Sequence, residues 1–359
     1  MINNIPFLLA LHSVDGLGPI RLKAILDYFK DPKLAWEANR NQLQEIGIPA
    51  SAVNLLVEIR RKLDPFGYAQ SIADSGIKWM SVFDQNYPKL LAQIYAPPVI
   101  LYYQGEIQPE DKKAIAIVGT RKMTGYGKVV AQNFTKELSL AGLTIVSGLA
   151  RGIDSQAHLT AIENSGRTIA VLGGGLNNLF PPENRGLAAK IALGFGAVIS
   201  EFPPDCPSLP GNFPARNRII SGLSLGVCVV EAAEDSGSLI TARHALEQGR
   251  EVFAVPGPIT SALSKGPITL IQEGARIVYS PEDILEELRI DRSGRIDKIS
   301  QDLSDEEKKV LASLENENMH IDDLGRKLVF PAAKISALLL KMEISGLVQS
   351  LGSGIYCRR

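Results

Sequence analysis

Arginines beside glycine-rich turns are the residues of this chain whose types and spacing best suit chemistry with anions. Gly119, Thr120 and Arg121 follow directly on the apolar run 114–118, and a pattern typical of an amphipathic helix comes after them. Glycine turns expose backbone N–H groups, and a guanidinium binds two phosphate oxygens at once. The spacing therefore predicts a phosphate-binding turn that carries Arg121. The other interpretation is that these glycines only make the tight turns of a packed α/β unit.

Similar glycine turns follow later apolar runs of the chain. The carboxyl ends of parallel strands meet at one edge of a sheet, so we expect these turns to lie together. Several arginines beside several such turns suit a string of phosphates, and aromatic rings can stack on unpaired bases. The predicted DNA- or phosphate-binding residues are Gly119, Thr120, Arg121, Ser147, Gly148, Gly173, Gly174, Phe180, Arg185, Arg216, Asn217, Arg218, Gly237, Ser238 and Thr241.

Other interpretations stay open for four side chains of this region. The rings of Phe180 and Phe213 could be ordinary core residues, and Phe213 fits that interpretation better. Arg216 and Arg218 could form salt bridges between subunits instead of binding phosphate.

Residues for catalysis are few. Asp154 and His158 lie four apart on an expected helix and could form an acid–base pair, but an aspartate at a helix start is more often a cap. Glu201 and Glu231 end strands and could reach the same edge. The chain has no GxSxG, Walker or HExxH motif, and GTRKMTGYG lacks the GxGxxG spacing of dinucleotide-binding enzymes. We therefore expect no catalytic residue and no cofactor.

The composition limits the possible partners and locations. A formal net charge of −1 gives no overall attraction to nucleic acid, so a local basic patch must bind any polyanion. The four histidines and three cysteines show no metal-ligand spacing, and unpaired cysteines suit a reducing compartment. No apolar run could span a bilayer, and the N-terminus lacks the basic region of a signal peptide. These features predict a cytoplasmic protein with no metal site and no membrane partner.

The elements that must position the site form an alternating pattern. Near-continuous apolar runs separated by helical segments predict a doubly wound, Rossmann-like α/β sheet over residues 76–285. Two more strand-like stretches, 77–82 and 99–105, are expected to extend or cap an edge of the sheet. The runs expected to be buried strands are 114–118, 143–146, 168–176, 197–204, 226–233, 251–258 and 276–280.

Different patterns flank this domain. Residues 1–75 are helical, and the turn 14–19 resembles a helix-hairpin-helix (SAM-like) element flanked by Arg21 and Lys23; a protein-binding helical module is the equal alternative. Residues 286–302 are polar and predict a linker. Residues 303–359 predict a winged helix whose third helix carries only Lys334 and Lys341 as basic residues. A protein contact, or completion of the fold, explains that helix at least as well as DNA reading.

Seven stretches of the middle domain follow one another in the order AIVGTRKMTGYG, IVSGLARGIDSQAH, TIAVLGGGL, FPPENRGL, FPARNRIISGLS, VVEAAEDSGSLITARHALEQGREVFAVPG and LIQEGA. Together they resemble the DNA-processing protein A family (DprA, also called Smf). The resemblance implies a bacterial cytoplasmic protein that binds single-stranded DNA, dimerises through its Rossmann-like domain, protects incoming DNA in natural transformation and helps load the RecA recombinase, with no known enzymatic activity.

The resemblance also assigns individual residues. Arg121 matches the basic residue of the family's G-[ST]-R turn, and Arg185 matches the basic position after PxEN. Arg216 and Arg218 match the FPxRNRII segment. Phe180 stands where the family usually has Tyr, and Ile268 where it often has Asn, so a polar contact at Ile268 is in doubt.

An enzyme of the lysine-decarboxylase-like (LOG) type, which hydrolyses nucleotides, is the alternative. That family carries PGGxGTxxE, whereas the corresponding stretch here is EDSGSLITARHALEQG, without the GGxGT core. Release of free base from a nucleoside monophosphate would distinguish this enzyme from a binding protein.

Overall fold

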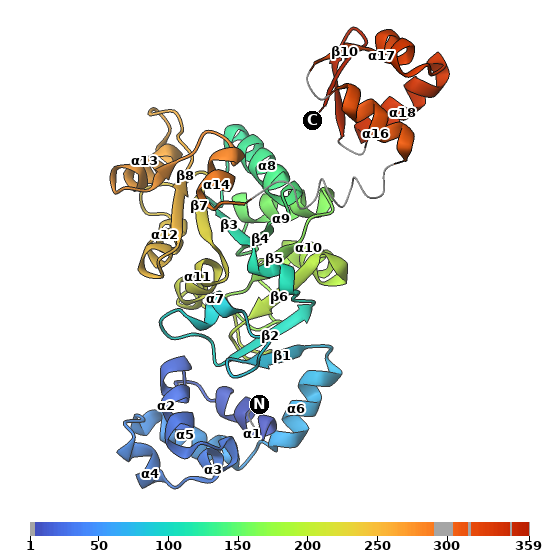
Figure 1. Cartoon of the computed structure of the whole chain (residues 1–359). Helices are drawn as coiled ribbons and strands as arrows, with labels where there is room; N and C mark the ends of the chain where they lie inside the picture. Colours follow the sequence, from blue (N-terminus) through green and yellow to red (C-terminus); the bar gives the residue numbers. More distant parts are fainter. Residues whose placement is uncertain (1–3, 291–303, 315–316, 345–346, 359) are drawn as a thin grey trace. The chain divides into compact units, whose positions relative to one another are not determined.

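The chain forms two compact units, Met1–Ile290 and Asp291–Arg359 (Figure 1). The computed structural model describes residues 4–290, 304–314, 317–344 and 347–358. The expected linker 286–302 begins within helix α14 (Pro281–Glu287), and from residue 291 onward it lies outside the described residues.

A nine-stranded sheet within residues 4–290 organises the first unit, with the order β1-β2-β6-β5-β4-β3-β7-β8-β9. Strands β3 to β9 are parallel, whereas β2 pairs antiparallel with β6 and β1 antiparallel with β2. The doubly wound fold is confirmed, and the stretches 77–82 and 99–105 extend one edge of the sheet. The strands are β1 (Lys78–Ser81), β2 (Ile100–Gly105), β3 (Ala114–Val118), β4 (Thr144–Ser147), β5 (Thr168–Val171), β6 (Gly196–Ser200), β7 (Gly226–Val229), β8 (Glu251–Ala254) and β9 (Arg276–Ile277).

Several apolar runs of the sequence extend beyond the ends of their strands at the carboxyl edge of the sheet. The sequence predicts one strand over 168–176, but β5 ends at Val171 and residues 172–176 continue as a buried loop. The runs that begin at β6 and β7 also continue as buried or half-buried loops, whereas the run that begins at β8 is buried only as far as Val255 and is exposed at Pro258. Apolar patterning reports burial, and here the loops at the strand ends are themselves covered.

Helices cover both faces of the sheet, and the side chains of β3, which point to alternate faces, are buried on each of them. Ile115 and Ile117 pack with α8, α9 and α14, whereas Ala116 and Val118 pack with α11 and α12 on the opposite face. A sheet buried on both faces explains why its strands are apolar throughout. The helices of this region are α7 (Lys89–Ala92), η1 (Pro109–Lys112), α8 (Gly125–Leu140), α9 (Ile153–Glu163), η2 (Pro182–Asn184), α10 (Arg185–Lys190), η3 (Ile191–Phe195), α11 (Asn212–Leu223), α12 (Gly237–Glu247), η4 (Ala262–Ser264), α13 (Lys265–Gln272) and α14.

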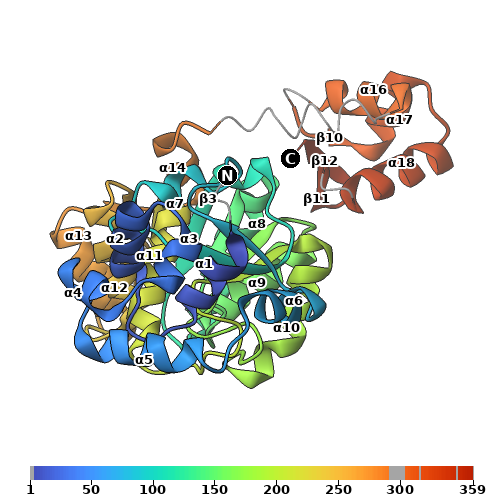
Figure 2. The ribbon, with the colours of Figure 1, turned by 90° about the horizontal axis from the view of Figure 1, so that it is seen from below.

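The N-terminal helices pack onto the β1–β2 edge of the sheet (Figure 1), and Figure 2 views these helices from below. One apolar cluster runs from Leu8 and Leu22 in these helices to Tyr102 and Val198 in β2 and β6. His12 Nδ1 lies 3.1 Å from the hydroxyl of the fully buried Tyr102. The helical segment therefore shares a core with the sheet. Its helices are α1 (Ile5–His12), α2 (Pro19–Phe29), α3 (Pro32–Glu37), α4 (Arg40–Glu45), α5 (Ala50–Arg60) and α6 (Pro65–Asp74).

The second unit is a winged helix, as predicted. Ser304 and Glu307 cap its first helix reciprocally, and Val310, Leu324 and Leu339 meet in its core. The small sheet has the order β10-β12-β11. The elements are α16 (Asp305–Ser313), β10 (Met319–His320), α17 (Ile321–Leu328), α18 (Ala332–Ile344), β11 (Val348–Gly352) and β12 (Ile355–Arg358).

Candidate functional site

A hollow lies at the carboxyl ends of β3, β4 and β5, where the sequence predicts that the glycine turns meet. It draws on four separate stretches of chain, of which two follow strands, one precedes α10 and one lies on α11. The lining residues are Arg121, Gly148, Ala150, Arg151, Phe180, Pro181, Phe213 and Arg216.

Exposed cations and an exposed aromatic ring surround the hollow. Arg121 is exposed, and its guanidinium carbon lies 5.6 Å from the centre of the Phe213 ring. The Phe180 ring is 44% exposed, and its centre lies 6.0 Å from that of Phe213. Arg185 lies outside the lining, exposed at the start of α10, and follows Asn184, whose Nδ2 donates a 2.8 Å hydrogen bond to the carbonyl oxygen of Leu149. A guanidinium held against an aromatic face can contact a phosphate, and a partly exposed ring beside it can stack on a base.

Arg151 extends the same basic surface. It is exposed and forms an ion pair with Glu183, which raises the pKa of the Arg151 guanidinium. Its position three residues after Gly148 already places Arg151 at this edge from the sequence, although the predicted binding residues do not include it. Ala150 and Pro181 also line the hollow, and nothing in their residue types points to a site.

Two of the predicted arginines have partners inside the chain. Arg216 is only 4% exposed, and its Nη1 donates a 2.6 Å hydrogen bond to the carbonyl oxygen of Gly148. Burial lowers the pKa of its guanidinium to about 10, and nearby Asp154 opposes that shift. Arg218 forms a salt bridge with Glu201, with Nη2 2.6 Å from Oε2. Arg218 thus forms its salt bridge within the chain, whereas Arg216 bonds to backbone carbonyl oxygens and to Asn217.

Buried positions among the predicted turns serve packing. Gly173 is buried, and a Cβ added to it would lie 2.7 Å from the Phe213 ring, so its lack of a side chain admits that ring. Gly174 admits the loop at Ser208 in the same way. Ser147 is buried, and its hydroxyl donates to the carbonyl oxygen of Ile117. At these positions the tight-turn interpretation describes the geometry.

The start of α12 brings Gly237, Ser238 and Thr241 to the same edge, outside the lining of the hollow. Gly237 is exposed, whereas Ser238 and Thr241 are buried. Asn217 Nδ2 donates a 3.1 Å hydrogen bond to the carbonyl oxygen of Gly237.

The sheet reverses its winding between β3 and β7, the crevice where Rossmann-type proteins bind nucleotides. Here the carboxylate of Glu231, which follows β7, fills that place. Its Oε2 accepts a 2.9 Å hydrogen bond from the Thr124 N–H, and its Oε1 accepts one of 2.6 Å from the Thr124 hydroxyl. Thr124 caps α8, and Thr120 N–H donates to the Glu231 carbonyl oxygen at 2.7 Å. The chain's own anion therefore occupies the helix start that would otherwise bind a dinucleotide phosphate.

Asp154 and His158 are buried and bonded to different groups. Asp154 accepts a 3.1 Å hydrogen bond from the Gly148 N–H, and burial raises the pKa of its carboxyl. His158 Nδ1 lies 2.6 Å from the Thr168 hydroxyl, and burial lowers the pKa of the imidazole to about 3. These partners give both residues structural roles. Among the described residues, no group of three or more His, Cys, Asp or Glu side chains could hold a metal ion, and none of the helices there has the length and apolar character of a membrane span.

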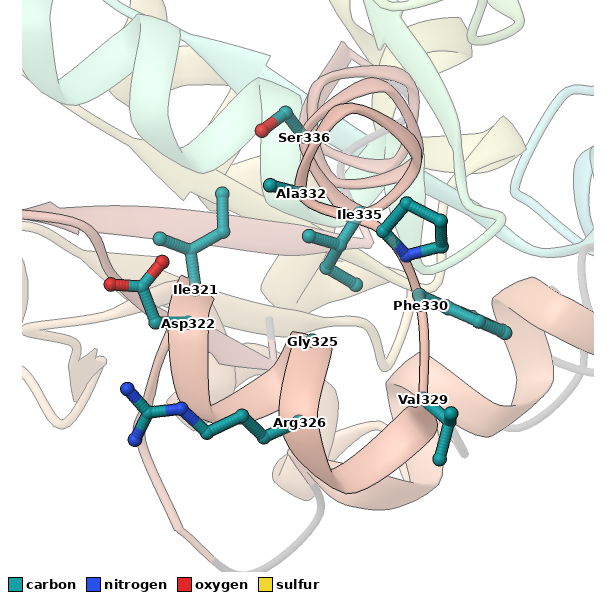
Figure 3. A pocket seen from close by; sticks show the side chains of 10 residues that line it. Ile321, Asp322, Gly325, Arg326, Val329, Phe330, Ala332, Ile335 and Ser336 are labelled. Carbon is teal, nitrogen blue, oxygen red and sulfur yellow. The ribbon is translucent and has the colours of Figure 1, made fainter.

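The winged helix has a hollow of its own between α17 and α18, lined mainly by apolar groups such as Ile321, Val329 and Ile335, with Asp322 and Arg326 at its edge (Figure 3). Both lysines of α18 pair with α16. Lys334 bonds to Glu306, and Lys341 Nζ lies 2.9 Å from Glu307 Oε1. These pairs reduce the positive charge that the third helix would offer to DNA.

Comparison with known proteins identifies relatives over most of the chain. A model of the family "DNA recombination-mediator protein A" matches residues 78–289, and a model of the DprA winged helix domain matches residues 297–354. Protein Smf from Synechocystis is 35% identical over 390 residues, with 98% of each chain covered.

The solved structures that are similar to this chain include two DNA processing proteins. DNA processing protein A from Streptococcus pneumoniae has 36% identity and a TM-score of 0.70, and the match covers 80% of this chain and 99% of that one. DNA processing protein A from Helicobacter pylori, described for its single-stranded DNA binding mode, has 30% identity and a TM-score of 0.52, and covers 58% and 98%.

Proposed function

The chain belongs to the DNA recombination-mediator protein A (DprA/Smf) family, and we propose that it binds single-stranded DNA in that role through the hollow beside β3, β4 and β5. The observation that carries the proposal is Arg121, an exposed cation held against Phe213 and close to the exposed ring of Phe180. Duplex DNA hides its base faces, so a site that joins cations to an exposed ring suits unpaired strands.

The proposed contacts divide by chemistry. Arg121, Arg151 and Arg185 are exposed and bind the phosphates, and the Phe180 ring stacks on a base. Gly119 and Thr120 belong to the turn that carries Arg121, and Gly237 lies exposed farther along the same edge. Such contacts bind any sequence with similar affinity, as a protein that receives DNA of arbitrary sequence requires.

The other features of the proposal rest on the family. We propose a cytoplasmic homodimer that delivers single strands to the RecA recombinase during recombination or natural transformation, without enzymatic activity. The Glu231 carboxylate in the crevice between β3 and β7 is consistent with a binding protein that does not hold a nucleotide there. No observation favours the LOG-type hydrolase over such a binding protein.

Charge removal at the hollow tests the proposal. We expect Arg121→Ala and Arg185→Ala each to weaken the binding of a labelled oligothymidylate. Each should also make the binding less dependent on salt, so that the negative slope of log affinity against log salt becomes shallower by about 0.7 for each phosphate that is no longer neutralised. Arg243→Ala, which removes an exposed arginine of α12 outside the hollow, is the matched control and should change neither. Wild-type affinity and slope in both Arg121→Ala and Arg185→Ala would place the DNA elsewhere.

A further inference from the structure

Three consecutive residues in the middle of α11, Arg216, Asn217 and Arg218, reach three different parts of the carboxyl edge. Side chains of successive helical residues point about 100° apart, so three in a row cover roughly half of the helix circumference. Arg216 reaches the ends of β4 and β5, Asn217 reaches the start of α12, and Arg218 reaches Glu201 after β6.

Arg216 and Asp154 hold the Gly148 peptide from opposite sides. Arg216 Nη1 donates to the carbonyl oxygen of Gly148, while Asp154 Oδ2 accepts from its N–H. Arg216 also donates to the carbonyl oxygen of Val171, so one guanidinium joins the ends of two strands. A Cβ at Gly148 would lie 2.7 Å from the Arg216 guanidinium, which explains the glycine.

Asn217 continues the same chain of hydrogen bonds. Its Oδ1 accepts from Arg216 Nε at 3.2 Å, and its Nδ2 donates to the carbonyl oxygen of Gly237. The turn after β4, the end of β5 and the start of α12 are thus linked through two adjacent side chains.

We propose that Arg216 and Asn217 are positioning residues without DNA contacts of their own. They hold the turn after β4, which carries the exposed Arg151, together with the end of β5 and the start of α12. The inference rests on the proposed function, because it assigns the roles within the same site. It differs from the sequence prediction, in which both residues bind phosphate. A guanidinium that is 4% exposed and donates to two carbonyl oxygens has little surface left for a phosphate.

The salt dependence of binding separates positioning from contact. A cation that contacts a phosphate displaces counterions, so its removal lowers the salt slope by about 0.7, whereas removal of a positioning residue weakens binding at every salt concentration alike. The variants are Arg216→Met, which keeps the length of the side chain, and Asn217→Ala. In the double variant Arg216→Met with Asp154→Asn, no buried carboxylate is left without its cation, which protects folding.

We expect each variant to bind oligothymidylate at least about tenfold more weakly, because each substitution removes more than one hydrogen bond that holds the site, and to keep the wild-type salt slope. Arg121→Ala, measured alongside, lowers the slope. A shallower salt slope in the Arg216 variants would mean that Arg216 contacts a phosphate. Wild-type affinity in these variants would mean that Arg216 has no role in binding. Either result overturns the proposal.

A measurement without DNA keeps the inference separate from the proposed function. Hydrogen exchange of the peptide containing residues 148–152 should become about tenfold faster in Arg216→Met and in the double variant, because one hydrogen bond fewer holds this turn, with the exchange of β7 unchanged as the control. Unchanged exchange at 148–152 would refute the positioning role, even if the wild-type protein does not bind single-stranded DNA. Absence of wild-type binding with faster exchange in the variants would refute only the proposed function.

Discussion

The carboxylate of Glu231 is predicted to stabilise the first unit by capping α8 from the neighbouring strand. It is 4% exposed and accepts two hydrogen bonds from Thr124, one from the backbone and one from the hydroxyl. Hydrogen bonds to a charged group contribute about 1.5–3 kcal/mol each, so Glu231→Ala should cost about 3 kcal/mol or more. Glu231→Gln keeps the shape and one acceptor and loses mainly the favourable charge at the helix start, about 1 kcal/mol.

Urea unfolding followed by tryptophan fluorescence measures this cost. The only two tryptophans of the sequence, Trp36 and Trp79, both lie in the first unit, so the signal excludes the winged helix. With an m value of about 3 kcal/mol/M, the Ala variant should unfold about 1 M earlier in urea. Wild-type midpoints in the Ala variant would refute the capping role.

Small anions provide the control for this interpretation. Acetate can enter the space that the Ala substitution leaves at the helix start, so it should raise the urea midpoint of Glu231→Ala relative to chloride at equal ionic strength. The wild-type midpoint should not respond, because its own carboxylate fills the place. An equal response of both proteins would mean that acetate acts on the protein surface in general.

Three further predictions concern buried groups. Cys228 is fully buried and burial raises its pKa to about 12, so the native protein should react with Ellman's reagent only at the partly exposed Cys206 and Cys357, and a third thiol should appear on denaturation. The pKa of His158 is about 3 in the folded protein and about 6.5 in the unfolded chain, so the unfolded chain binds the proton first as the pH falls. The free energy of unfolding should therefore decrease between pH 6.5 and pH 3, by up to about 1.4 kcal/mol per pH unit. The urea midpoints at pH 7 and pH 5 should differ less in His158→Asn than in the wild type, and an equal difference would exclude this histidine as the cause. Gly148→Ala should weaken DNA binding in anisotropy titrations, because its Cβ displaces the Arg216 guanidinium, and unchanged binding would contradict the geometry of that turn.

The architecture could be predicted because its signal is local. The apolar run 114–118 and the glycine turn after it indicate a buried strand and its end directly, and the alternation of strands and helices then implies a doubly wound sheet. Convergence of Arg121, Gly148 and Phe180 also followed from the rule that parallel strands end at one edge.

The roles of individual residues at that edge depend on partners far away in the sequence. Arg216 has the residue type of a phosphate ligand, and only the packing of α11 against β4 and β5 shows that it is buried against backbone carbonyl oxygens. Gly173 is the start of a typical phosphate turn, but Phe213, from a distant part of the chain, covers it. Glu231 fills the nucleotide crevice by reaching Thr124, a pairing that no local pattern predicts.

The most direct test of the central claim is fluorescence anisotropy of labelled single-stranded and duplex oligonucleotides of the same sequence, titrated with the full chain at two salt concentrations. The proposed site predicts tighter binding of the single strand and a marked loss of affinity at the higher salt concentration, because several phosphates are neutralised. Equal or tighter binding of the duplex, or no binding of either form by the folded protein, would contradict it.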